Sequence, residues 1–207
     1  MSLWSALRVS WQAYKTRRKM NRQFGKREDP FSYSTTPYEA ARLAAMAEAL
    51  GAGALGPVLE VGCAEGHFTE KLVGRSSRVL ALDISTVALG RARRRAAAAV
   101  FLEADLMAWE PGSAAPFDAI ILGDVLYYLD RPGVAAEFAA LFPRIASWLK
   151  PGGRLLLAHG FSSDKELAHR RSFRERFEGA GLRLASETIP GADRGGVRCL
   201  LSTLEKI

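Results

Sequence analysis

A short apolar run that leads into a glycine loop and then a helical segment constrains the fold most strongly. Residues 57–62, PVLEVG, predict a buried parallel strand because they are apolar and partly β-branched. The loop Gly62-Cys63-Ala64-Glu65-Gly66 follows, and residues 68–73 predict a helix. Glycines at both ends of this loop allow the backbone to approach a ligand closely at the helix N-terminus. The pattern is typical of the nucleotide-binding half of a doubly wound fold.

An acidic residue at the end of the next predicted strand supports this interpretation. Residues 78–82 predict that strand, and Asp83 follows it, 21 residues after Gly62. A carboxylate at this place accepts hydrogen bonds from both hydroxyls of a ribose. Dinucleotide-dependent dehydrogenases share the pattern, but their fingerprint is G-x-G-x-x-G and this loop reads G-x-A-x-G. A nicotinamide-dependent oxidoreductase is therefore disfavoured, and taken singly the loop is also compatible with an ordinary strand–helix turn.

The rest of the chain alternates in the same way. Further strands are predicted over residues 100–104, 117–122 and 154–159, the last after a turn at 150–153, and a hairpin over 182–189 and 197–204 through a turn at 191–196. Helices are predicted from Pro37, where Thr36 and Glu39 form a capping box, to about Leu50, after Ser85, over 132–148, and from a cap at Asp164 to about Gly179. The prediction is an α/β, doubly wound, Rossmann-like fold. Its seven-stranded, mostly parallel sheet has an antiparallel C-terminal hairpin strand, and N-terminal helices form a lid.

Length and composition bound the organisation of the chain. At about 150 residues per domain, the 207 residues predict a basic helical arm and linker over 1–36 and a single domain over 37–207. No apolar run reaches the length of a membrane-spanning helix. The two cysteines and three histidines show no metal-ligand spacing, and no signal peptide is recognisable, because Arg8 and Gln12 interrupt the first apolar segment. We therefore expect a cytoplasmic protein without a metal site, and the oligomeric state stays open.

The net charge of +7 lies entirely in the arm. Residues 1–28 carry eight basic residues against Glu28, so the charges of the remaining chain sum to zero. Within the arm an apolar stripe recurs at helical spacing, formed by Trp4, Leu7, Trp11 and Tyr14. A membrane-surface helix, a nucleic-acid contact and an attractor for anionic substrates are all compatible with it. The simplest interpretation, which we favour, is a helix that docks on the body through these aromatic residues with its charges solvated.

The ordered segments resemble a known family. LEVGCAEG, LALD, LEADL, FDAIILGDVLYYL and LKPGGRLLLAHG, followed by the C-terminal hairpin, resemble the class I S-adenosylmethionine-dependent methyltransferases over about residues 37–204. The stretches DPFSYSTTPYE and DVLYYL are similar, more narrowly, to the nodulation methyltransferases, a NodS-like group that acts on the amine of a chitooligosaccharide. The resemblance implies S-adenosyl-L-methionine as cofactor. It also implies a small-molecule methyl acceptor. An amine of an amino sugar or glycoconjugate is the preferred acceptor group, and a hydroxyl is the next candidate.

The resemblance also implies which residues contact the cofactor. The glycine loop would lie under the methionine and ribose parts, with Glu60 at the acidic strand position, Asp83 on the ribose, and Ile84 on the adenine. Asp105 and Leu106 would lie at the adenine edge, and Asp124 would contact the amino group of the cofactor or of the substrate. The loop residues implied are Gly62, Cys63, Ala64 and Gly66, and the lid residues are Tyr33, Tyr38 and Arg42.

The implied catalytic residues are His159, Asp124 and Tyr128. His159 is the leading candidate for a base because it ends a strand on the ligand side and its ordinary pKa suits proton removal, although a structural histidine fits equally well. Of Tyr127 and Tyr128, one is expected in the core. His67 is expected to be structural. Other groups are expected to be solvated, namely His169 and the arginines at 91, 93, 94 and 95.

Two further functions stay open. The basic arm would suit an RNA methyltransferase, although the segment after the fourth strand lacks the glutamate and histidine set of the metal-dependent RNA 3′-end enzymes, so a nucleic-acid partner is disfavoured. A non-catalytic interaction protein that keeps the fold is the other alternative. The intact glycine loop, with Asp83 and Asp105, argues against it.

Overall fold

The computed structural model describes residues 3–191 and 194–207, which form a three-layer α/β structure around one mixed sheet. The sheet has seven strands in the order β3-β2-β1-β4-β5-β7-β6. The parallel strands are β1 (Leu55–Val61), β2 (Ser76–Asp83), β3 (Val100–Glu103), β4 (Phe117–Gly123) and β5 (Leu149–Phe161). The hairpin of β6 (Leu182–Thr188) and β7 (Arg198–Lys206) adds β7 antiparallel to β5. The predicted fold class is confirmed.

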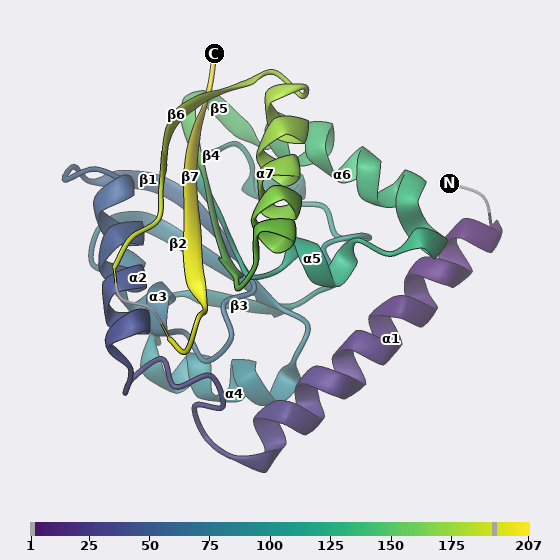
Figure 1. Cartoon of the computed structure of the whole chain (residues 1–207), viewed down its shortest axis with the longest axis horizontal. Helices are drawn as coiled ribbons and strands as arrows, with labels where there is room; N and C mark the ends of the chain where they lie inside the picture. Colours follow the sequence, from purple (N-terminus) through teal and green to yellow (C-terminus); the bar gives the residue numbers. More distant parts are fainter. Residues whose placement is uncertain (1–2, 192–193) are drawn as a thin grey trace.

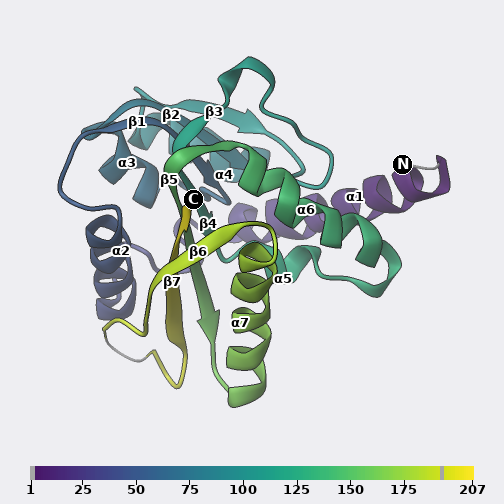
Figure 2. The same ribbon diagram turned by 90° about the horizontal axis from the view of Figure 1, so that it is seen from above.

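Helices cover both faces of this sheet, as Figure 1 and Figure 2 show. One face carries α2 (Pro37–Ala49), α3 (His67–Val73) and α4 (Thr86–Arg95), and the other carries α6 (Ala135–Ser147) and α7 (Asp164–Glu178). Successive strand residues point to opposite faces: Leu59 packs in the cluster under α6 and α7, and Val58 in the cluster under α2. Because both faces are covered, the central strands are continuously apolar.

Two predicted helix starts are confirmed by their caps. Thr36 Oγ1 accepts a hydrogen bond from the Glu39 N–H (3.4 Å) with Pro37 in the first turn, and Ser85 Oγ accepts from the Ala88 N–H (3.2 Å). The cap of α7 was predicted at the wrong residue. Ser163, not Asp164, accepts from the Glu166 N–H (3.3 Å). Both are good N-cap residues, so local preference could not separate them.

Two predicted boundaries differ from the structure. The turn predicted at 150–153 lies inside β5, where the pairing with β4 shifts register. The helix predicted over 132–148 is a 3-10 turn, η2 (Pro132–Val134), followed by α6, and two other short elements are η1 (Gly112–Ala114) and α5 (Leu126–Leu129). The predicted turn at 191–196 includes residues 192–193, which lie outside the described residues. Its described part is closed by a bridge between Arg194 and Val197.

The helix α1 (Leu3–Lys26) docks through a different face from the predicted one. Figure 1 shows it along one side of the molecule, from the start of α6 to α4. Its buried apolar residues are Val9, Met20 and Phe24. By contrast, Trp4, Leu7, Trp11 and Tyr14 are 75%, 53%, 58% and 51% exposed. Polar contacts reinforce the docking: Gln12 Nε2 donates to the Leu129 carbonyl (3.2 Å) and Arg17 pairs with Glu103 (2.8 Å). The prediction that the aromatic stripe docks the helix is wrong, because a second apolar stripe fits the body.

In the described part of the chain, no helix combines the length with the hydropathy that a bilayer-spanning segment needs.

The aromatic packing between α6 and α7 generates a stability prediction. Phe138 is fully buried, and its ring meets those of Phe142 and Phe173 edge-on at 5.2 and 5.9 Å. We expect Phe138→Ala to lower the free energy of unfolding by about 3–5 kcal/mol, because the cavity left behind cannot collapse. Urea denaturation measures this, with the exposed Ile189→Ala as the control, expected within about 0.5 kcal/mol of wild type. Equal effects of the two substitutions would contradict the packing described.

Candidate active site

A cavity of about 460 Å³ opens at the carboxyl ends of the parallel strands. Ligands of doubly wound folds bind at this edge, because the strand ends and the loops that follow them meet there. Ten of the predicted site residues line it: Tyr33, Tyr38, Gly62, Ala64, Asp83, Ile84, Asp105, Leu106, Asp124 and Tyr128. Residues far apart in the sequence are thus brought to one cavity.

Packing inside the protein requires a glycine at position 62, as does the close approach of a ligand. Its φ of +79° is a conformation that residues with a side chain rarely adopt, and a Cβ there would overlap Cγ2 of Val125. Gly66 has a φ of +82°, and a Cβ there would lie 3.1 Å from Cα of Ala92 in α4. Gly66 therefore permits close helix packing and does not itself line the cavity.

The carboxylate of Asp83 is held in a fixed orientation at the end of β2. Oδ2 accepts from the Ala64 N–H (2.9 Å) and Oδ1 from the Ser85 N–H (2.8 Å). Burial raises the pKa of Asp83, while these backbone hydrogen bonds oppose the rise. Each carboxylate oxygen can accept a second hydrogen bond. Asp83 therefore keeps acceptor capacity for hydroxyl groups in the cavity.

Asp105 extends the polar lining after β3. Its Oδ1 accepts from the Met107 N–H (3.1 Å), and burial raises its pKa. Leu106 and Ile84, which also line the cavity, give this end an apolar character. A planar heterocycle with one exocyclic donor group fits such a lining.

Arg42, although predicted to touch the cofactor, lies behind the cavity wall and holds it together. Its guanidinium is buried, pairs with Glu39 Oε2 (3.1 Å) and Asp124 Oδ2 (2.9 Å), and donates to the Ala158 carbonyl (3.3 Å). Asp124 Oδ1 also accepts from the Gly160 N–H (2.8 Å). The Asp124 side chain is still 26% exposed and borders the cavity. Arg42 therefore positions Asp124 and does not line the main cavity.

Glu60 and Cys63 also support the loop from behind. Thr69 Oγ1–H donates to Glu60 Oε2 (2.6 Å), and burial raises the pKa of Glu60 to about 7. Burial likewise raises the pKa of the Cys63 thiol. Neither side chain borders the main cavity. The two positions follow from the strand–loop pattern, but their inward direction does not.

His159 is buried and does not line the cavity. Its ring packs against those of Phe173 (5.6 Å) and Tyr127 (6.0 Å), and its Nε2 has no hydrogen-bond partner among the described residues. Burial lowers its pKa to about 3. An imidazole that holds a proton so weakly is a poor general base at neutral pH. The structure therefore argues against the predicted catalytic role, because alternation along β5 turns this side chain toward α7.

Several cavity residues were missed by the sequence analysis. The helix α1 contributes Thr16, Met20 and Phe24, and α7 contributes Arg170. The apolar residues at 9, 20 and 24 share one helix face and could have signalled this docking. Both Tyr127 and Tyr128 border the cavity, and Tyr127 also packs against the main core, as expected for one of the two.

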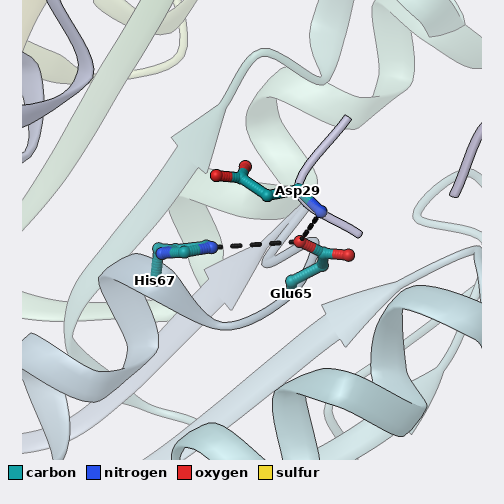
Figure 3. A group of neighbouring side chains, drawn as sticks. All are labelled: Asp29, Glu65 and His67. Carbon is teal, nitrogen blue, oxygen red and sulfur yellow. Dashed lines mark hydrogen bonds and ion pairs between the residues drawn. The ribbon is translucent and has the colours of Figure 1, made fainter. Parts of the chain in front are cut away.

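A cluster of Asp29, Glu65 and His67 joins the segment before α2 to the glycine loop, as Figure 3 shows. The Asp29 N–H donates to Glu65 Oε2 (2.9 Å), and His67 Nε2 lies 3.9 Å from the same oxygen. The ring of Tyr33 stacks on His67 at 5.1 Å. Acidic and imidazole groups this close can hold a metal ion. However, Arg91 already pairs with Glu65. We therefore interpret the cluster as a structural contact that holds Tyr33 over the cavity.

Several residues predicted to be solvated are engaged instead, among them Arg91 and His169. Arg91 is half-buried in its ion pair with Glu65. His169 Nε2 lies 2.7 Å from Asp130 Oδ2, and its Nδ1 lies 2.8 Å from Nη1 of Arg170. Glu65 and Asp130 are remote in sequence from Arg91 and His169, so periodicity alone could not identify these pairs.

Comparison with known proteins identifies the family. The model of the NodS family, described as Nodulation protein S, matches residues 15–181. The chain belongs to the NodS family. Nodulation protein S of Rhizobium tropici is 35% identical over 133 residues, which cover 62% of this chain and 54% of that protein. The protein of the same name from Sinorhizobium fredii is 31% identical over 141 residues, covering 66% and 63%. The chain thus spans between half and two thirds of these relatives.

Solved structures show the same fold. The N-methyltransferase NodS of Bradyrhizobium japonicum WM9, in complex with S-adenosyl-L-homocysteine, superimposes with a TM-score of 0.79 and 24% identity. The match covers 92% of this chain and 98% of that one. At this identity the likeness establishes the fold. Trans-aconitate 2-methyltransferase of Azoarcus sp. is also similar, 35% identical over 102 residues, which cover 48% of this chain and 37% of that protein.

The buried carboxyl of Glu60 generates a pH prediction. A folded-state pKa near 7, above the value of about 4.3 in an unfolded chain, means that the folded protein binds this proton more tightly. Its contribution to stability is therefore present below about pH 4 and is lost as the pH rises through 7. We expect Glu60→Gln to become more stable than wild type as the pH rises from 5 to 9, by up to about 3 kcal/mol.

Urea denaturation at pH 5, 7 and 9 measures this difference. The control is Glu48→Gln, on the exposed side of α2. A Glu60→Gln difference that stays constant across this pH range would show that Glu60 is ionised equally in both states.

Proposed function

We propose that this chain is an S-adenosyl-L-methionine-dependent methyltransferase that acts on an amine of a small molecule, with an amino sugar or glycoconjugate as the preferred acceptor. A hydroxyl is the alternative acceptor on the same molecule. The observation that carries the proposal is the oriented Asp83 carboxylate beside the Gly62 turn, in a cavity of about 460 Å³. Membership of the NodS family supports it, since the N-methyltransferase NodS of B. japonicum was solved with S-adenosyl-L-homocysteine.

The residues of the cavity fit the proposed cofactor. Asp83 would accept from the ribose hydroxyls, Ile84 and Leu106 would contact the adenine, and Asp105 would accept from its exocyclic amine. When bound, the cofactor supplies an electrophilic methyl group on a sulfonium with its own leaving group. The protein then has to align the acceptor and exclude water. Met20, Phe24 and Tyr33 supply an apolar cover for this purpose.

Asp124 is the residue that we assign to the acceptor. Its carboxylate borders the cavity, and Arg42 and the Gly160 N–H hold it in place. It can accept a hydrogen bond from an amine N–H and so orient the nitrogen lone pair. Burial raises the pKa of the Tyr128 hydroxyl, which therefore stays neutral and able to donate to a hydroxyl of the acceptor. Neither role requires His159.

A carboxylate acceptor is a second candidate. Two arginines, Arg170 and Arg194, line the cavity and could bind an anionic acceptor. The similarity to trans-aconitate 2-methyltransferases supports this alternative.

We also propose that the activity resides in the cytoplasm. Both Cys63 and Cys199 are buried free thiols. Unpaired thiols are typical of a reducing compartment.

The cofactor assignment predicts the effect of Asp83→Ala. We expect calorimetric titration of S-adenosyl-L-homocysteine into wild type to give a Kd near 1 μM, about −8 kcal/mol. Asp83→Ala should weaken this binding at least about tenfold, because the ribose hydroxyls lose their acceptor. The exposed Asp164→Ala is the control, and NADH should not bind. Unchanged binding in Asp83→Ala would exclude the proposed site, and no binding to wild type would exclude the cofactor.

The acceptor class is then tested by enzymatic turnover. A de-N-acetylated chitooligosaccharide and a tricarboxylate such as aconitate are offered separately, and release of S-adenosyl-L-homocysteine is measured. Turnover of the amine supports the preferred acceptor, and turnover of the tricarboxylate alone supports the second candidate.

The position of His159 predicts that its substitution leaves the chemistry intact. We expect His159→Leu to keep the turnover rate within about threefold of wild type, because the ring lies outside the cavity, whereas loss of a general base slows turnover by about 10²–10⁴-fold. Thermal unfolding of the variant serves as the check on folding. If a folded variant turned over about a hundredfold more slowly than wild type, the result would support His159 as a general base.

A further inference from the structure

Among the described residues, the outer face of α1 is a large apolar feature that the proposed active site does not explain. Trp4, Leu7, Trp11 and Tyr14 project away from the body, while Met20 and Phe24 on the opposite face border the cavity. At a rise of about 1.5 Å per residue, the four exposed residues extend over about 15 Å of helix. Isolated exposed apolar residues are common, but a continuous row of this kind marks an interaction surface.

The same face carries strong positive charge. The helix α1 contains seven lysines and arginines and no acidic residue. Steps of three and four residues lead from Trp4 through basic residues on the same side, namely Arg8, Lys15, Arg18 and Arg22, all of them exposed. Lys15 Nζ lies 5.1 Å from the centre of the Trp11 ring. The outer face is therefore apolar and aromatic in its N-terminal half and cationic along its whole length.

We propose that this face binds the surface of an anionic phospholipid bilayer. A helix that lies in the membrane interface combines an apolar stripe containing Trp and Leu with flanking lysines and arginines. Trp and Tyr side chains favour the headgroup level, where their rings are buried and their polar atoms stay hydrated. Trp4, Leu7, Trp11 and Tyr14 would enter this level, and the flanking cations would contact lipid phosphates.

Charge and ring geometry favour a bilayer over other partners. A second copy of the same face would oppose cations to cations, since α1 has no carboxylate to pair with them. Bases of single-stranded nucleic acid stack on free aromatic faces. Here Trp11 already stacks on Tyr14 at 5.6 Å and has Lys15 beside its ring, and the exposed Leu7 offers nothing to a base. An anionic bilayer uses both the charge and the apolar row.

Binding to a bilayer does not require α1 to leave the body. The inner face stays packed through Val9, Met20 and Phe24, and through the ion pair of Arg17 with Glu103. The outer face can therefore be occupied while the cavity is closed on the other side. The proposal does not depend on methyl transfer, so its test needs neither cofactor nor acceptor.

The test is sedimentation of the full chain with vesicles. Vesicles of equal parts phosphatidylglycerol and phosphatidylcholine are compared with pure phosphatidylcholine, at 0.05 and 0.5 M NaCl. We expect at least about tenfold stronger partitioning to the anionic vesicles at low salt, and a large loss at high salt. The double variant Trp4→Ala/Trp11→Ala should lose at least about tenfold of this partitioning, because the rings that enter the interface are gone.

Matched variants separate the contribution of the basic residues from that of the aromatic rings. Arg18→Gln/Arg22→Gln should lower binding to anionic vesicles and leave binding to phosphatidylcholine unchanged. Ile189→Ala, which removes an exposed apolar residue elsewhere, should bind as wild type. The altered residues are exposed, and an unchanged thermal unfolding temperature confirms that each variant is folded.

Three outcomes would overturn the proposal. The first is equal sedimentation of wild type and Trp4→Ala/Trp11→Ala. The second is retention of a labelled oligouridylate, but not of vesicles, which would assign the face to nucleic acid. The third is a dimer in analytical ultracentrifugation that disappears in the double variant, which would assign the face to a second copy.

Discussion

The buried guanidinium of Arg42 is the constraint on which the active-site geometry depends. A charge taken out of water destabilises the fold unless it is paired and hydrogen-bonded, and Arg42 meets Asp124, Glu39 and the Ala158 carbonyl. These contacts join α2, the loop after β4 and the end of β5. Asp124 adopts a φ of +53°, uncommon for a residue with a side chain, and its other oxygen holds the Gly160 N–H. The position of the carboxylate in the cavity therefore follows from an ion pair behind the wall.

The parts of the site that could be predicted from the sequence are those set by local geometry. The glycine loop and Asp83 follow a strand directly, so the strand pattern alone brings them to the sheet edge. Arg42 and Asp124 are 82 positions apart, and nothing local to either residue indicates their pairing. The predicted direction of the His159 side chain, toward the ligand, was wrong for a related reason. Its position at the carboxyl end of β5 was correct, but the alternation of the strand turns the ring toward Phe173.

The docking of α1 shows what periodicity can and cannot decide. A helical spacing identifies which residues share a face, but it does not say which face meets the body. The helix α1 carries two such faces. The face with Met20 and Phe24 is buried and lines the cavity. The face with Trp4, Trp11 and Tyr14 lies outside. Aromatic content was therefore a misleading guide to burial in this helix.

The two faces of α1 together restrict how an acceptor can reach the cavity. The inner face contributes Thr16, Met20 and Phe24 to the lining and so closes that side. The polar lining on the side of α7 comes from Ser162, Glu166 and Arg170. Binding of the outer face to a bilayer would further stabilise the position of α1. In the proposed function the acceptor would then enter past α7, and substitutions near Glu166 would alter acceptor binding more than cofactor binding.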